Sequence, residues 1–232
     1  MRTSKRAVRA KKLPTLRQAE AWIAEVIQPL LRSLGVSRNW IERRRSVTWR
    51  FYDRSVESLS SIADMIPADS RPLLEQLGRF RPEVAERIIE CDKLRSACVD
   101  LAAQAYDGLL VDPEFQQAVQ RADSEFAASV PPAKREWEGA FSHDDRPKLA
   151  AQYVVNNVQS DSVPPDYTTR EFWSRHGSAL IAFRGNPKHR ERFAALDSAL
   201  DHLKEVLQEV HETLSRLRDE LADQLGLPAV VR

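Results

Sequence analysis

The chain of 232 residues is 42% hydrophobic and 30% charged, with a formal net charge of +1, a composition typical of a globular domain with its own core. Its apolar runs are too short to span a membrane, and its seven glycines form no dinucleotide- or phosphate-binding loop, so we expect no membrane partner and no cofactor. The two cysteines, Cys91 and Cys98, lie too far apart along one helix for a disulfide, which favours a reducing, cytoplasmic location.

Residues 1–54 form a basic head. They contain 14 Lys and Arg against 4 Asp and Glu, whereas the remaining residues contain 21 against 30. This split favours an anionic partner or the self-association of opposite charges. We therefore expect a protein partner or a homo-oligomer, and contact with RNA or DNA through residues 1–54. Residues 1–12 are predicted to be a disordered basic tail, and the alternative is that this tail only aids solubility.

The first helix is predicted to begin at a capping box. Thr15 and Gln18 have the spacing at which each side chain can bond to the other's backbone. Pro29 is expected to bend this helix, because it lacks the backbone N–H that continues the ladder, and Gly35 is expected to end it.

A second helix is predicted over 37–66, and arginines alternate with aromatic residues in its first half. Arginine forks suit phosphate oxygens, and aromatic rings stack on unpaired bases, so this half is a candidate surface for nucleic acid. The alternative is that its tryptophans are core residues whose neighbouring arginines reach out to water. The predicted nucleic-acid-binding residues are Arg38, Arg43, Arg44, Arg45, Arg50 and Arg54.

The next helices are predicted from proline and glycine. A short helix is expected after Ser70 and is expected to end at Gly78. A long helix is expected from Pro82 to Leu110, with both cysteines in its buried stripe as packing residues. Asp112, directly before a proline, is expected to cap the helix that follows.

Three further elements are predicted before the final helix. A short helix is expected over 133–146, and another begins at about Arg146. Residues 159–166 have the polar, proline-ending composition of a loop. Thr168 or Thr169 is then expected to cap the penultimate helix.

The final helix is predicted over Arg190–Leu225, with Asn186 and Pro187 expected to cap and start it. Its apolar residues follow one another at intervals of three and four, as in a heptad seam. Small or apolar residues also occupy the g positions of its middle heptads, so we predict burial within its own bundle, not an exposed dimerisation arm. The seam residues are Phe193, Leu196, Leu200, Leu203, Leu207, Val210, Leu214, Leu217 and Leu221.

No segment alternates with the period of two that strands require, so we predict an all-α fold. The expected architecture is a multi-helix bundle with a long, heptad-patterned C-terminal helix. Residues 13–232 are expected to form a single helical domain, and the alternative is a sub-boundary near 130–165.

An arginine and a histidine lie just before the final helix. Arg184 and His189 have four residues between them, and Arg170 and His176 form a second pair of this kind. The first pair resembles the Arg-x4–6-His motif of HEPN-domain ribonucleases, helical bundles found in bacterial toxins and defence systems. The resemblance implies a dimeric, metal-independent site in which Arg184 stabilises the phosphate charge and His189 acts as general acid or base. The alternative is a capped corner between helices with two basic surface residues.

Two functions therefore remain open, and the sequence does not decide whether the protein is an enzyme. The first is a helical interaction or regulatory subunit of a bacterial complex, whose basic N-terminal region contacts nucleic acid. The second is a HEPN-like endoribonuclease of a toxin or anti-phage system that uses Arg184 and His189. No metal site is expected, because the histidines and glutamates of the final helix lack the Glu-x-x-His spacing of di-metal bundles.

Overall fold

The computed structural model describes residues 14–32, 34, 68–129, 146–157 and 167–226, and every element in these ranges is helical. The predicted all-α class is therefore confirmed. The predicted tail, the helix over 37–66, the loop over 159–166 and all but the last residue of the helix over 133–146 lie outside the described residues. None of the described helices has the apolar length that a bilayer crossing requires.

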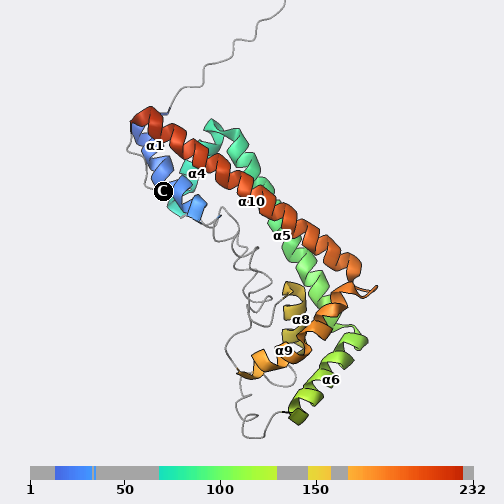
Figure 1. Cartoon of the computed structure of the whole chain (residues 1–232). Coiled ribbons are helices and arrows are strands. Elements are labelled where there is room, and N and C mark those ends of the chain that lie inside the picture. The colour runs from blue at the N-terminus through green and yellow to red at the C-terminus, as the bar shows by residue number, and fades with distance from the viewer. Residues whose placement is uncertain (1–13, 33, 35–67, 130–145, 158–166, 227–232) are drawn as a thin grey trace, which may run out of the picture.

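Two long helices run along the length of the molecule. They are α5 (Pro82–Leu110), whose predicted bounds are confirmed, and α10 (Arg190–Leu225). Figure 1 shows the two helices side by side. They are antiparallel, since Arg81 directly before α5 forms an ion pair with Glu220 near the end of α10, at 2.5 Å. At about 1.5 Å per residue, α10 is roughly 54 Å long.

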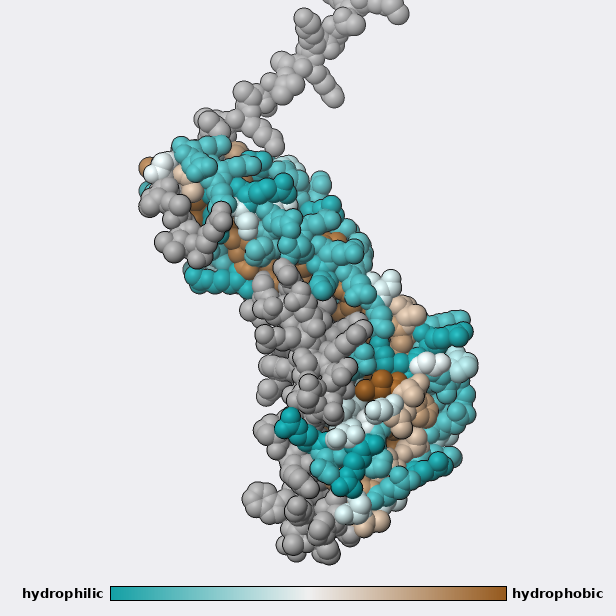
Figure 2. Space-filling view, viewed as in Figure 1, coloured by the Kyte–Doolittle hydropathy of each residue, from teal (hydrophilic) through white to brown (hydrophobic). Residues whose placement is uncertain are grey.

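The seam of α10 is buried, as predicted. None of its nine residues is more than 6% exposed, and Val206 at a g position is only 2% exposed. Ala199, at another g position, is partly buried against the same core. The face of α10 that is turned toward the viewer in Figure 2 is mainly hydrophilic. The helix is therefore one side of the protein's own core, which is why its apolar stripe is wider than a coiled-coil seam.

One end of the long pair is covered by N-terminal elements. The capping box at Thr15 is confirmed, since the N–H of Gln18 donates to Oγ1 of Thr15 over 3.3 Å and the N–H of Thr15 donates to Oε1 of Gln18 over 3.0 Å. A π-helical turn precedes Pro29. Proline has no backbone N–H, so the regular α-helical hydrogen bonds are interrupted here. The elements here are α1 (Leu16–Trp22), η1 (Ile23–Ile27), η4 (Ala68–Ser70) and α4 (Arg71–Phe80).

The prediction that Gly78 ends a helix is wrong. Helix α4 continues through this residue to Phe80. A Cβ built on Gly78 would lie 3.0 Å from Cβ of Ala85 in α5. The glycine therefore allows α4 to approach α5 closely, a role that its position in the sequence does not reveal.

The other end of the long pair is covered by three helices and a short 3-10 turn. Aromatic contacts join them: Phe126 meets Phe172 edge to face at 5.6 Å, and Tyr153 meets Trp173 at 4.8 Å between ring centroids. The penultimate helix begins at Tyr167, slightly earlier than the predicted cap. The elements here are α6 (Pro113–Ser129), α8 (Arg146–Asn156), α9 (Tyr167–Ile181) and η8 (Ala182–Gly185).

Candidate functional site

The segment that carries the Arg–His motif is a tight turn between η8 and α10. The final helix spans Arg190–Leu225, as predicted, but the prediction that Asn186 and Pro187 cap and start it is wrong, since its N-cap residue is His189. The side-chain oxygen of Asn186 accepts the N–H of Lys188 over 2.9 Å, and its carbonyl accepts the N–H of Arg190 over 2.8 Å. Asn186 therefore holds a local turn, as asparagine often does, in place of the first turn of the helix.

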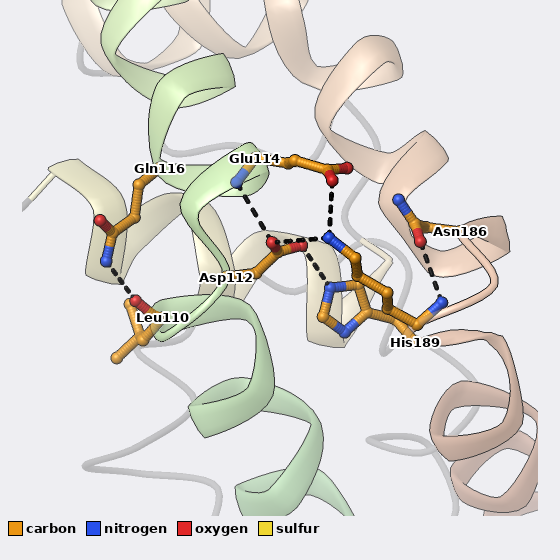
Figure 3. Close-up of polar contacts among 7 residues, drawn as sticks. Leu110, Asp112, Glu114, Gln116, Asn186 and His189 are labelled. Carbon is orange, nitrogen blue, oxygen red and sulfur yellow. Dashed lines mark hydrogen bonds and ion pairs between the residues drawn. The ribbon is translucent and has the colours of Figure 1, made fainter.

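This turn faces the turn between α5 and α6, and four charged or titratable side chains meet there (Figure 3). We call Asp112, Glu114, Lys188 and His189 the polar corner. Asp112 Oδ1 accepts the N–H of Glu114 over 3.1 Å, which confirms Asp112 as a cap of α6. Its other oxygen, Oδ2, lies 2.8 Å from Nε2 of His189, and both side chains are 4% exposed. An ionised carboxylate can only accept, so the ring N–H of His189 donates this hydrogen bond.

Lys188 lies on the exposed side of the polar corner. Its Nζ lies 2.6 Å from Oε1 of Glu114 and 3.6 Å from Oδ1 of Asp112. The hydrogen bond to Glu114 raises the pKa of Lys188, and the charge of Asp112 also raises it. Lys188 is thus paired with Glu114 in the first turn of α6 and His189 with Asp112 just before it, and the pairs join two segments that are far apart in the chain.

Asp112 is ionised in this environment. Burial alone raises the pKa of a carboxyl group, but the hydrogen bonds from His189 and from the N–H of Glu114, together with the charge of Lys188, outweigh burial. The net pKa of Asp112 is therefore below its usual value of 3.8. An acid whose pKa is lowered by folding stabilises the folded state above that usual value.

We predict that Asp112→Asn destabilises the protein at neutral pH by about 1–3 kcal/mol, because the cap geometry is kept while a charged hydrogen bond is lost. The stabilisation by the carboxylate is present above pH 3.8 and is lost as the pH falls through the lowered pKa of the folded state. Urea unfolding of both proteins at pH 7, 5 and 3 measures the difference. A gap that stays constant down to pH 3 would contradict the ionic contribution of Asp112.

Arg184 is held by another set of contacts. Its Nη1 donates to the carbonyls of Val154 and Val155 at 2.9 and 3.0 Å, near the end of α8. Its Nη2 donates to both carboxylate oxygens of Asp197 in α10 at 2.7 and 2.8 Å, and its guanidinium lies 4.4 Å from the ring centroid of Phe193. Only 12% of its side chain is exposed. Arg184 therefore joins α8 to α10, and its donors are directed into the protein.

The two residues of the predicted ribonuclease motif thus bind different partners within this chain. Arg184 contacts α8 and α10, whereas His189 contacts the turn between α5 and α6. In the second pair, Arg170 is exposed, and His176 Nδ1 lies 3.9 Å from Glu125 in α6. Their catalytic use stays a prediction, and it requires at least Arg184 to exchange internal partners for a phosphate.

The other predicted site residues are placed as follows. The six arginines of the predicted nucleic-acid surface lie outside the described residues. His202 lies 3.8 Å from Glu205 on the exposed side of α10, and the described ranges contain no group of three or more potential metal ligands. Cys91 and Cys98 are each 1% exposed, and burial raises the pKa of Cys91 to about 12, so its thiol stays protonated and serves packing.

The pairing of Asp112 with His189 was not predicted from the sequence. Each residue was considered for a local role, but 77 positions separate them and no periodicity links two turns. Comparisons with family models, with curated proteins and with solved structures found no match to this chain.

Proposed function

We propose that this protein is a helical interaction subunit whose α5–α10 pair is a rigid support and whose basic head contacts nucleic acid. The observation that carries the proposal is the internal pairing of the two motif residues. Arg184 makes four hydrogen bonds inside the protein, and His189 is 3% exposed. The contribution of these contacts to stability therefore explains both residues. An interaction role does not require Arg184 or His189 to exchange its partners.

A groove at one end of the long pair supports an interaction role. It has a volume of about 200 Å³ and lies between the start of α5 and the last turns of α10. Val84 and Leu217, both buried, form its apolar part, and Arg216 and Glu220 line it with charge. This is the part of α10 where charged residues return to the g positions, so a protein partner would meet mainly charged groups there, above a buried apolar floor.

The nucleic-acid part of the proposal rests on the charge of residues 1–54, which hold 14 Lys and Arg against 4 Asp and Glu. Binding that depends on phosphate neutralisation releases counterions, so affinity falls as salt rises. We predict that the full chain binds a fluorescently labelled single-stranded RNA of about 20 nucleotides, an ample site size for stacking and charge contacts. Fluorescence anisotropy at a series of salt concentrations should show a steep linear fall of log affinity against log salt.

Two double variants identify the surface. Arg43→Gln with Arg44→Gln should reduce the salt slope by about 1.4, because each neutralised phosphate of a single strand contributes roughly 0.7. Arg79→Gln with Arg121→Gln removes the same charge from exposed positions outside the basic head and should leave the slope unchanged. Equal effects of the two pairs, or binding that does not depend on salt, would contradict the proposed nucleic-acid surface.

A further inference from the structure

The inner side of the polar corner contains an unsatisfied polar atom. His189 is 3% exposed, and its Nε2 is bonded to Asp112, but its Nδ1 has no hydrogen-bond partner. In the neutral ring, with the proton on Nε2, Nδ1 is an acceptor without a donor, and in the charged ring it is a donor without an acceptor. Folded proteins rarely leave such an atom unpaired, so a group from outside the chain is expected to complete it.

The unpaired Nδ1 faces a niche over Gly108 in the last turn of α5. A Cβ built on Gly108 would lie 3.8 Å from Nδ1 of His189 and 2.3 Å from Nη1 of Arg192. The absence of a side chain at Gly108 therefore leaves room that Nη1 of Arg192 occupies, with Nδ1 of His189 at its border. Arg192 is an exposed residue of α10, so its guanidinium can move outward to admit a ligand atom.

We propose that this niche binds one oxygen of a small oxyanion, a carboxylate or a phosphate group. An anion there favours the ring of His189 with a proton on both nitrogens, which donates from Nδ1, and the fork of Arg192 donates from the other side, so the oxygen receives two charge-assisted hydrogen bonds. Asp112 stabilises the charged ring through Nε2 and orients it. Both acids of the polar corner are already paired with Lys188 and His189, and Arg192 supplies the positive charge on the niche side.

The start of α10 adds to this positive charge. His189 is the N-cap residue of this helix of 36 residues, but its ring caps no backbone N–H because it is bonded to Asp112. The first N–H groups of α10 and the positive end of its dipole thus lie beside the niche. The proposed anion site uses none of residues 1–54, so it and the proposed nucleic-acid binding can fail independently.

The test is a titration of the full chain, labelled with ¹⁵N in histidine, at constant ionic strength and pH 6. Sodium acetate and inorganic phosphate are added separately, and the Nδ1 chemical shift of His189 is followed by NMR. We expect a saturable shift with at least one anion, and the responding anion identifies the ligand class. Arg192→Gln should weaken binding by about tenfold or more, because one charge-assisted hydrogen bond is lost. Gly108→Ala should abolish the shift, because the added methyl group fills the niche.

The glycine variant has a matched control. Gly108→Ala should fold, since its methyl group meets only the flexible end of Arg192 and alanine favours a helix. Gly185→Ala adds a methyl group with no atom within 4 Å and should bind like the wild-type protein. If Gly108→Ala does not fold, Arg192→Gln alone decides. The proposal is overturned if neither anion causes a saturable shift, or if Arg192→Gln binds as tightly as the wild-type protein.

Discussion

Leu214→Ala is expected to lower the free energy of unfolding by about 2–5 kcal/mol, the range for a buried leucine that leaves a cavity. Leu214 lies in the seam of α10 with 0% of its surface exposed. Surrounding helices hold the seam from several sides, so the cavity cannot collapse fully. Because a domain of this kind is stable by about 5–15 kcal/mol in total, the change is a large share of its stability.

Leu16→Ala is the matched control for this prediction. Leu16 is 52% exposed on α1, so the same truncation should cost at most about 0.5 kcal/mol. Urea unfolding followed by circular dichroism at 222 nm compares the two variants. Equal losses at Leu214 and Leu16 would show that the seam of α10 is not the core of the domain.

Arg184→Ala is expected to cost roughly 2–4 kcal/mol, because Asp197 loses its hydrogen bonds from Nη2 and two backbone carbonyls lose those from Nη1. The carbonyl of Val154 also accepts the N–H of Asn157, so the carbonyl of Val155, near the end of α8, depends more on Arg184. Arg184→Lys should recover little of this loss, since the single nitrogen of a lysine cannot take the place of both Nη2 at Asp197 and Nη1 at the carbonyls.

Arg190→Ala separates this effect from the general loss of a positive charge. Arg190 is exposed in the first turn of α10, where a cation is slightly unfavourable, so its removal should leave the stability unchanged within about 0.5 kcal/mol. Thermal and urea unfolding measure both variants under the same conditions. Arg184→Ala and Arg190→Ala with the same unfolding midpoint would contradict the role of Arg184 as a tie between α8 and α10.

Local patterns explain the part of the fold that the sequence predicts. The capping box at Thr15, the bounds Pro82–Leu110 and the buried seam of α10 each depend on residues within a few turns of one another. Periodicity and caps describe such short-range relations well. The bounds Arg190–Leu225 were also predicted, but the predicted cap at Asn186 is wrong, because asparagine can either cap a helix or hold a turn of its own.

The contacts of the candidate site depend on tertiary structure. Arg184 meets carbonyls that lie 29 and 30 positions away, and backbone carbonyls carry no side-chain signal in the sequence. Asp112 and His189 meet only because α5 and α10 are antiparallel and bring their adjoining turns together. Gly78 is a further case, since its approach to Ala85 depends on how α4 lies against α5. Sequence reasoning found these residues but assigned them local or catalytic roles.

We expect Arg184 and His189 to support the structure and not to cleave RNA. Incubation of purified full-length protein with total RNA tests this expectation most directly. Under the interaction role, the RNA stays intact over hours at all protein concentrations, with His189→Gln, checked for folding by circular dichroism, as the control. Cleavage by the wild-type protein that is lost in the folded His189→Gln variant would contradict the interaction role and support the ribonuclease resemblance.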